Sequence, residues 1–140
     1  MATRQEIVAA VRARVTTVIT APGADRSDRV EGVFRGALPA FAVRGVLLSS
    51  ERAGMGYGGL HRMIERIEVA VLTSQGDGIT NAAEALAAQV RDAILAAPRD
   101  LDDLVFDLRL AGQAAEIEAG EVRIARAEIG FDAEHFGNLA

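Results

Sequence analysis

The stretch from Glu51 to Arg62, ERAGMGYGGLHR, contains the residue types that most directly suggest chemistry. Gly54, Gly56 and Gly59 spell G-x-G-x-x-G, the spacing with which dinucleotide-binding proteins cradle a pyrophosphate. That site needs a helix N-terminus after the glycines, because free N–H groups of the helix hold the phosphate. Here a strand-like alternation follows Gly59, and the chain has no Gly-Lys-Ser/Thr motif. We therefore predict a mobile hairpin loop over residues 51–62 that contacts a partner.

Five side chains of this loop are the predicted assembly contacts. Three are apolar or aromatic and two are basic, so the loop offers both kinds of contact to another protein surface. They are Arg52, Met55, Tyr57, Leu60 and Arg62.

The other polar residues form no catalytic or metal-binding pattern. His61 and His135 lack metal-ligand spacing to carboxylates, so we expect solvated surface histidines. No serine lies in a Gly-x-Ser-x-Gly elbow. An aspartate cluster lacks the alternation, central glycine and later glutamate of a calcium loop, and is expected to cap or solvate a turn: Asp100, Asp102, Asp103 and Asp107. The prediction is a protein that is not an enzyme, with no catalytic residue, metal or cofactor.

Composition points to a single domain spanning residues 1–140. Half of the residues are hydrophobic, which excludes a disordered chain, and there is no cysteine for a disulfide. The net charge is −5 and the basic residues, all arginine, are dispersed, which is unlike a nucleic-acid-binding surface. No stretch approaches the roughly 20 apolar residues of a membrane span. We expect a protein made in the cytoplasm, with no membrane partner.

Apolar spacing predicts the order of the secondary-structure elements. Residues 3–20 and 81–97 show helical spacing, with Thr3 and Asn81 as N-caps. Strands are expected over residues 38–48, 63–73, 104–110 and 122–131, and a bulge near Ala125 would explain a change of phase in the last one. Residues 132–140 are expected to form a loosely ordered tail.

These elements predict an α+β fold. Paired strands joined by short loops give a mostly antiparallel sheet of four to five strands, and the two helices would pack on one face of it. The expected architecture is a two-layer sandwich.

The segment Leu38-Pro39-Ala40-Phe41-Ala42-Val43 resembles the "LPAVAV" strand of the tail terminator proteins of long-tailed phages, the minor tail protein U family. The order of elements is also similar: an N-terminal helix, this strand, a long loop, an amphipathic strand at residues 66–72, a helix and a last strand. The resemblance covers most of the chain. Its strength lies in the order and spacing rather than in any one motif.

The resemblance implies a structural virion protein, of a phage or a phage-like gene transfer agent. Six copies would form a ring at the head–tail junction that caps the tail tube and ends its polymerisation. Its partners would be further copies of itself, the major tail tube protein and the head–tail connector or stopper protein, while DNA passes through without specific binding. Two alternatives stay open: another neck or tail-completion ring, and a small nucleotide-binding enzyme or ligand-binding domain that uses residues 54–59.

Overall fold

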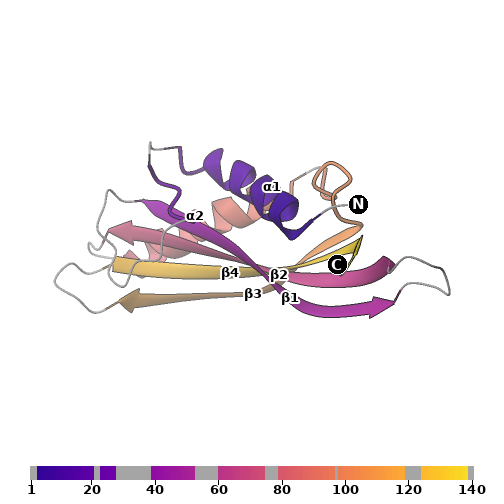
Figure 1. Ribbon diagram of the computed structural model, residues 1–140. Coiled ribbons are helices and arrows are strands. Elements are labelled where there is room, and N and C mark those ends of the chain that lie inside the picture. Colours follow the sequence, from indigo (N-terminus) through magenta and orange to yellow (C-terminus); the bar gives the residue numbers. More distant parts are fainter. Residues whose placement is uncertain are drawn as a thin grey trace.

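The computed structural model has two helices on one face of a four-stranded antiparallel sheet, which confirms the predicted α+β two-layer fold (Figure 1). It describes residues 3–20, 23–27, 39–52, 60–74, 79–96, 98–118 and 124–138. The elements follow in the order α1 (Arg4–Thr16), β1 (Ala40–Arg52), β2 (Leu60–Ser74), α2 (Ile79–Ile94), β3 (Asp107–Glu118) and β4 (Ile124–Asn138). The strands lie in the order β1-β2-β4-β3, and every neighbouring pair is antiparallel.

Helix α1 begins at the predicted cap and ends earlier than predicted. The Thr3 hydroxyl oxygen accepts a hydrogen bond from the Glu6 backbone N–H at 3.2 Å, as an N-cap should. At the other end, the hydroxyls of Thr16 and Thr17 donate to the carbonyl oxygens of Arg12 and Arg14, at 2.8 and 2.6 Å. Such bonds compete with the helical pattern, and the helix stops at Thr16 rather than near residue 20.

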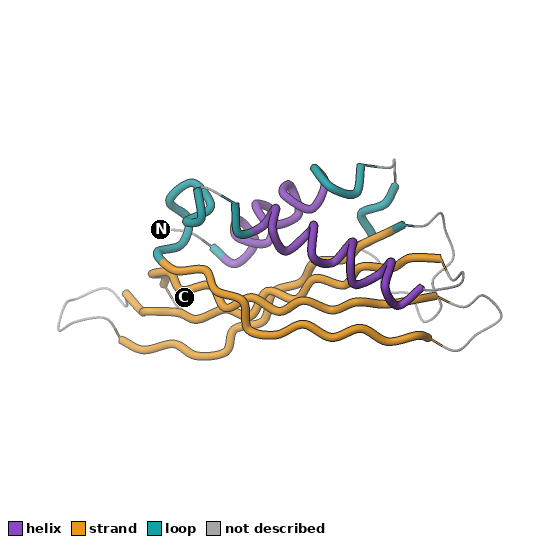
Figure 2. The backbone as a smooth tube through the Cα atoms, turned by 180° about the vertical axis from the view of Figure 1, so that it is seen from behind, coloured by secondary structure: helices purple, strands orange, loops and turns teal. Residues whose placement is uncertain are grey.

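The core lies between the helices and one face of the sheet, and Figure 2 shows both helices on that face. Ile7, Val11 and Val15 recur every four residues, which places them on one buried stripe of α1. Helix α2 buries small residues toward its start and larger ones toward its end: Ala83, Ala87, Val90 and Ile94. It begins at Ile79, so Asn81 lies inside the helix and is not its N-cap.

The two central strands, β2 and β4, pair without a break from Leu60↔Asn138 to Ser74↔Ile124. The bulge expected near Ala125 is therefore wrong. The buried hydrophobic residues of β4 keep one phase throughout, and several are small: Ala125, Ala127, Ile129, Phe131 and Ala133. The tail expected from residue 132 is also wrong through Asn138, because β4 continues to that residue.

The edge strands carry the bulges instead. The register of β1 against β2 shifts between Leu47 and Ser49, and that of β3 against β4 shifts between Leu110 and Gly112. Each shift leaves one residue of the edge strand without a partner, namely Leu48 and Ala111. A bulge in an edge strand bends it, which opposes uncontrolled pairing with other chains.

Candidate assembly surface

The end of the sheet formed by β1 and β2 contains part of the predicted contact loop. Strand β1 ends at Arg52, which pairs with His61, and β2 begins at Leu60, which pairs with Asn138. The loop between the strands is therefore shorter than residues 51–62. Residues 53–59, with Met55 and Tyr57, lie outside the described part of the chain.

The glycine motif of this segment lies between two strands, as the sequence predicts. Leu60, which directly follows Gly59, is the first residue of β2. A dinucleotide site would need a helix N-terminus there. The G-x-G-x-x-G spacing therefore lacks the helix N-terminus that it would need to bind a phosphate.

Arg62 lies on the face of the sheet opposite the helices, in an ion-pair network that crosses three strands. Its Nη2 is 2.5 Å from Glu134 Oε2, and Arg109 Nη1 is 2.7 Å from Glu134 Oε1. Arg109 also contacts Asp107 at 2.6 Å. The hydrogen bonds from Arg62 and then Arg109 lower the pKa of Glu134 below its ordinary value, and the same bonds raise the pKa of both arginines.

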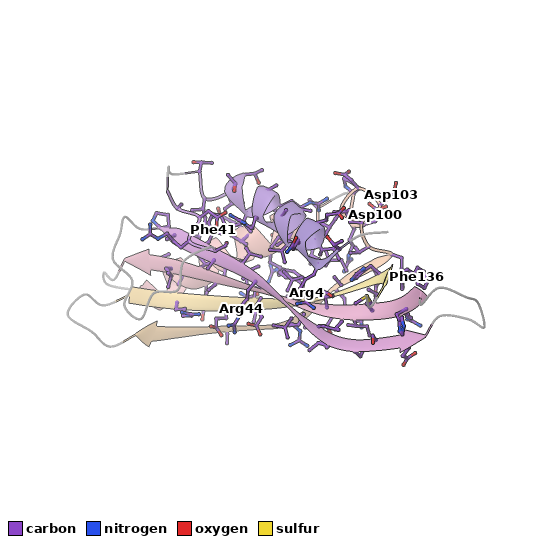
Figure 3. All side chains as sticks on the ribbon, in the orientation of Figure 1. Arg4, Phe41, Arg44, Asp100, Asp103 and Phe136 are labelled. Carbon is purple, nitrogen blue, oxygen red and sulfur yellow. The ribbon has the colours of Figure 1, made fainter. Side chains whose placement is uncertain are left out.

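An exposed aromatic pair lies beside this network. The ring centroids of Phe106 and Phe136 are 5.1 Å apart at an interplanar angle of 34°. The Arg62 guanidinium carbon is 5.6 Å from the Phe106 ring centroid, within cation–π range. Phe136 lies at the end of the sheet, below the loop that carries Asp100 and Asp103 (Figure 3). Both residues are nearly half exposed, so the pair can still bury area against a partner.

Sequence reasoning missed this pair because each phenylalanine was assigned to the wrong context. Phe136 fell in the expected tail, although alternation continues past Phe131. Phe106 was expected inside a strand, but β3 begins one residue later, and Phe106 bonds through its backbone N–H to the Glu134 carbonyl oxygen at 2.9 Å.

Further ion pairs cover the rest of the open face of the sheet. Arg44 and Glu68, which pair across β1 and β2, lie 2.5 Å apart, and Figure 3 shows Arg44 on the side away from the helices. Arg66 and Asp132 pair across β2 and β4 at 2.6 Å. These guanidinium groups therefore bind carboxylates of the same face.

On the helix side, the same end of the sheet contains a buried polar cluster. The side chain of Glu65 is 1% exposed, and Arg4 donates to its carboxylate from Nε at 2.9 Å. His135 Nε2 lies 3.8 Å from the other Glu65 oxygen, and the His135 side chain is 3% exposed. The prediction of a solvated histidine is wrong for His135, because β4 extends far enough to turn it inward.

The described residues offer no constellation for metal chemistry. Among them, no group of three or more histidine, aspartate or glutamate side chains could hold a metal ion. Asp102 and Asp103 are exposed in a turn with left-handed backbone (φ 58° and 69°), and Asp107 pairs with Arg109. Within the described chain, no helix is long and apolar enough to span a membrane.

Both edge strands have long stretches without a partner among the described residues. Residues 24–27 cover only the start of β1: Phe41 exchanges backbone hydrogen bonds with Ala24 and Arg26, and Val43 donates to the Ser27 hydroxyl. On β3, Arg99 Nε donates to the Leu108 carbonyl oxygen at 2.9 Å. Beyond these contacts, the residues that the structure describes leave the outer backbone groups of each edge strand for a second chain to pair.

The sequence matches no protein-family model, and no curated protein matches it. Among solved structures, 24 chains match. One belongs to the "Virion of native gene transfer agent (GTA) particle", with 15% sequence identity and a TM-score of 0.47 over 94% of this chain and 95% of that chain. A likeness of this extent does not define a function.

Proposed function

We propose that this chain is a tail terminator, a structural virion protein whose copies close into a ring on the tail tube. The ring, a homohexamer by resemblance to the family, ends tube polymerisation and joins the tail to the neck of the head. The partners are further copies of the chain, the major tail tube protein and a connector or stopper protein. Assembly takes place in the host cytoplasm, and the finished protein resides at the head–tail junction of the virion.

The observation that carries the proposal is a sheet whose two edge strands, β1 and β3, run in opposite directions and lack a strand partner over most of their length among the described residues. The order β1-β2-β4-β3 alternates in direction at every step, so β1 and β3 run antiparallel to each other. A second copy related to the first by rotation can place its β1 beside β3 of this chain. The two strands are then antiparallel, like every other neighbouring pair in the sheet. Such head-to-tail contacts form a closed ring when the rotation closes.

Two further features support a structural role over an enzymatic one. The described side chains offer no metal cluster, and the glycine motif lies between strands rather than before a helix. The arginines of the open face bind carboxylates, so DNA could pass such a surface without being held.

The loop at the β1–β2 end is the element that we expect to contact the tube. Deletion of residues 54–59 removes the glycine motif and keeps β1, the core and all of β2 except Leu60, which becomes part of a two-residue turn between Arg52 and His61. In a light-scattering assay of tube growth, the wild-type chain should stop elongation at substoichiometric amounts. The deletion variant should keep its thermal unfolding midpoint and fail to stop elongation. Growth arrest by the deletion variant equal to that by wild type would contradict the role of the loop.

The same assay tests the wider proposal. If the wild-type chain binds connector rings and has no effect on tube growth, the protein is a neck ring and not a terminator.

A further inference from the structure

A short segment between α1 and β1 covers the beginning of one sheet edge. Residues 24–27 run beside the first residues of β1, and Asp25 forms a parallel bridge with Phe41. The Phe41 N–H donates to the Ala24 carbonyl oxygen at 2.9 Å, and the Arg26 N–H donates to the Phe41 carbonyl oxygen at 2.8 Å. We call residues 24–27 the strap. It occupies the outer backbone groups of β1 where that strand begins.

Alternation along β1 shows which of its amides depend on the strap. In an antiparallel pair, successive residues of an edge strand direct their backbone groups alternately toward the neighbouring strand and away from it. The N–H groups of Phe41 and Val43, here called the strap amides, point to the strap, where Val43 donates to the Ser27 hydroxyl oxygen at 2.9 Å. Those of Ala42 and Arg44, here called the sheet amides, therefore point to β2. Neighbouring amides of one strand thus report separately on the strap and on the sheet.

Polar contacts of one carboxylate hold the strap in place. Asp25 Oδ1 accepts from the Ser27 N–H at 3.0 Å and from the Ser27 hydroxyl at 2.5 Å, and Asp25 Oδ2 accepts from Arg12 Nε of α1 at 2.8 Å. Burial raises the pKa of Asp25, but the hydrogen bonds from Ser27 and Arg12 outweigh this effect and lower the pKa below its ordinary value of 3.8. Among the four strap residues, only Ala24 is buried. The side chain of Asp25 therefore contributes more contacts to the closed strap than apolar burial does.

We propose that the strap opens while the sheet stays folded, and that Asp25 is the clasp that keeps it closed. Segments with few buried apolar contacts open at a lower free energy than the core does, and the strap buries one alanine side chain. While the strap is closed, a further strand can pair with β1 only beyond Val43. Opening adds the outer groups of Phe41 and Val43 to the available edge. This motion belongs to a single chain and does not depend on the proposed ring.

Amide hydrogen exchange of the full-length chain, resolved by residue with NMR at pH 7, tests the opening. The chain is kept at a concentration at which it is monomeric, and each rate is divided by the intrinsic rate for its sequence. In wild type, the strap amides should exchange faster than the sheet amides, because the strap opens more often than the sheet. Equal protection of the two sets would overturn the proposal, since the strap would then open only together with the sheet.

Two aspartate variants test the clasp. In Asp25→Asn the side chain can still accept from Ser27, but it loses the charge that Arg12 binds. Asp92→Asn makes the same change in an exposed ion pair of α2 and is the matched control. If Asp25→Asn does not fold, Ser27→Ala replaces it with Phe41 as the reporting amide, because it removes the hydroxyl that links Asp25 to β1.

The two sets of amides should respond differently to these variants. In Asp25→Asn, exchange at the strap amides should rise by about ten- to a hundredfold, the effect of losing one hydrogen bond between charged groups. Exchange at the sheet amides should keep its wild-type rate, and Asp92→Asn should change neither set. Strap amides that keep their wild-type rate in Asp25→Asn would overturn the role of Asp25 as the clasp. An equal rise at both sets would overturn the independent opening.

Discussion

The contact between Arg4 and Glu65 gives the sharpest prediction about stability. Arg4 reaches from the start of α1 to the sheet (Figure 3), where it is the ionic partner of a carboxylate that is 1% exposed. Arg4→Met leaves that carboxylate buried without its cation. Removal of one partner of a buried pair costs about 3–5 kcal/mol. Because Arg4 itself is 45% exposed, water can reach part of the site, and we expect the lower end, about 3 kcal/mol.

Substitution of the other partner, Glu65, should lower the free energy of unfolding by less. In Glu65→Leu the guanidinium returns to water, and the loss is that of one charge-assisted hydrogen bond, about 1.5 kcal/mol. The double variant Arg4→Met with Glu65→Leu removes both charges and keeps similar volume, so its stability should lie within about 1 kcal/mol of wild type. The two single changes are therefore strongly non-additive.

Urea denaturation followed by circular dichroism at pH 7 measures all three variants, at a chain concentration at which wild type is monomeric. A loss below about 0.5 kcal/mol for Arg4→Met, the range of an ordinary surface substitution, would refute the reasoning. The reasoning would also be refuted if the loss of unfolding free energy in the double variant equalled the sum of the losses in the two single variants.

Three further predictions concern close packing, pH and a helix end. Gly45→Ala should destabilise the fold by about 1–3 kcal/mol, because a Cβ there would lie 3.0 Å from side-chain atoms of α1. Gly112→Ala is the control: a Cβ at Gly112 would have nothing within 4 Å, so this variant should not be destabilised in the same thermal scan. Glu134→Gln should be less stable than wild type at pH 7. The pKa of Glu134 is lowered in the folded state, so its contribution to the free energy of unfolding is present above the ordinary value of 4.5 and is lost as the pH falls through the folded pKa. The unfolding midpoints of the two proteins should therefore converge in acid. A difference in midpoint that stays constant with pH would contradict this origin. Arg14→Met removes the 2.7 Å hydrogen bonds to the carbonyl oxygens of Ile94 and Ala96 at the C-terminal end of α2 and should cost about 1–2 kcal/mol in urea denaturation; an unchanged midpoint would show that water replaces them.

The sequence predicts the layers of this fold better than it predicts the ends of its strands. Spacing at every fourth residue identifies the buried stripe of α1, and alternation from Ile67 to Val71 identifies the inner face of β2. Both signals come from large aliphatic residues. Where most of the inner face is alanine, as in β4, the pattern is weak, and Ile124 indicates the opposite phase.

The predicted contact surface was incomplete for a related reason. The sequence predicts Arg62 as an assembly contact because it flanks the glycine loop. The structure places it on the open face beside Glu134, and this position does not test a role in assembly. Phe106 and Phe136 are 30 residues apart in sequence and meet only because β3 pairs with β4. A contact of that kind depends on the order of strands in the sheet, which alternation alone does not specify.

The most direct test of the central claim is to image purified protein by electron microscopy with tubes grown from the tail tube protein of the same particle. The account predicts closed rings of this chain on one end of each tube, and tubes that no longer lengthen when more subunits are added. Tubes that continue to grow with bare ends, in the presence of a folded chain at saturating concentration, would contradict it.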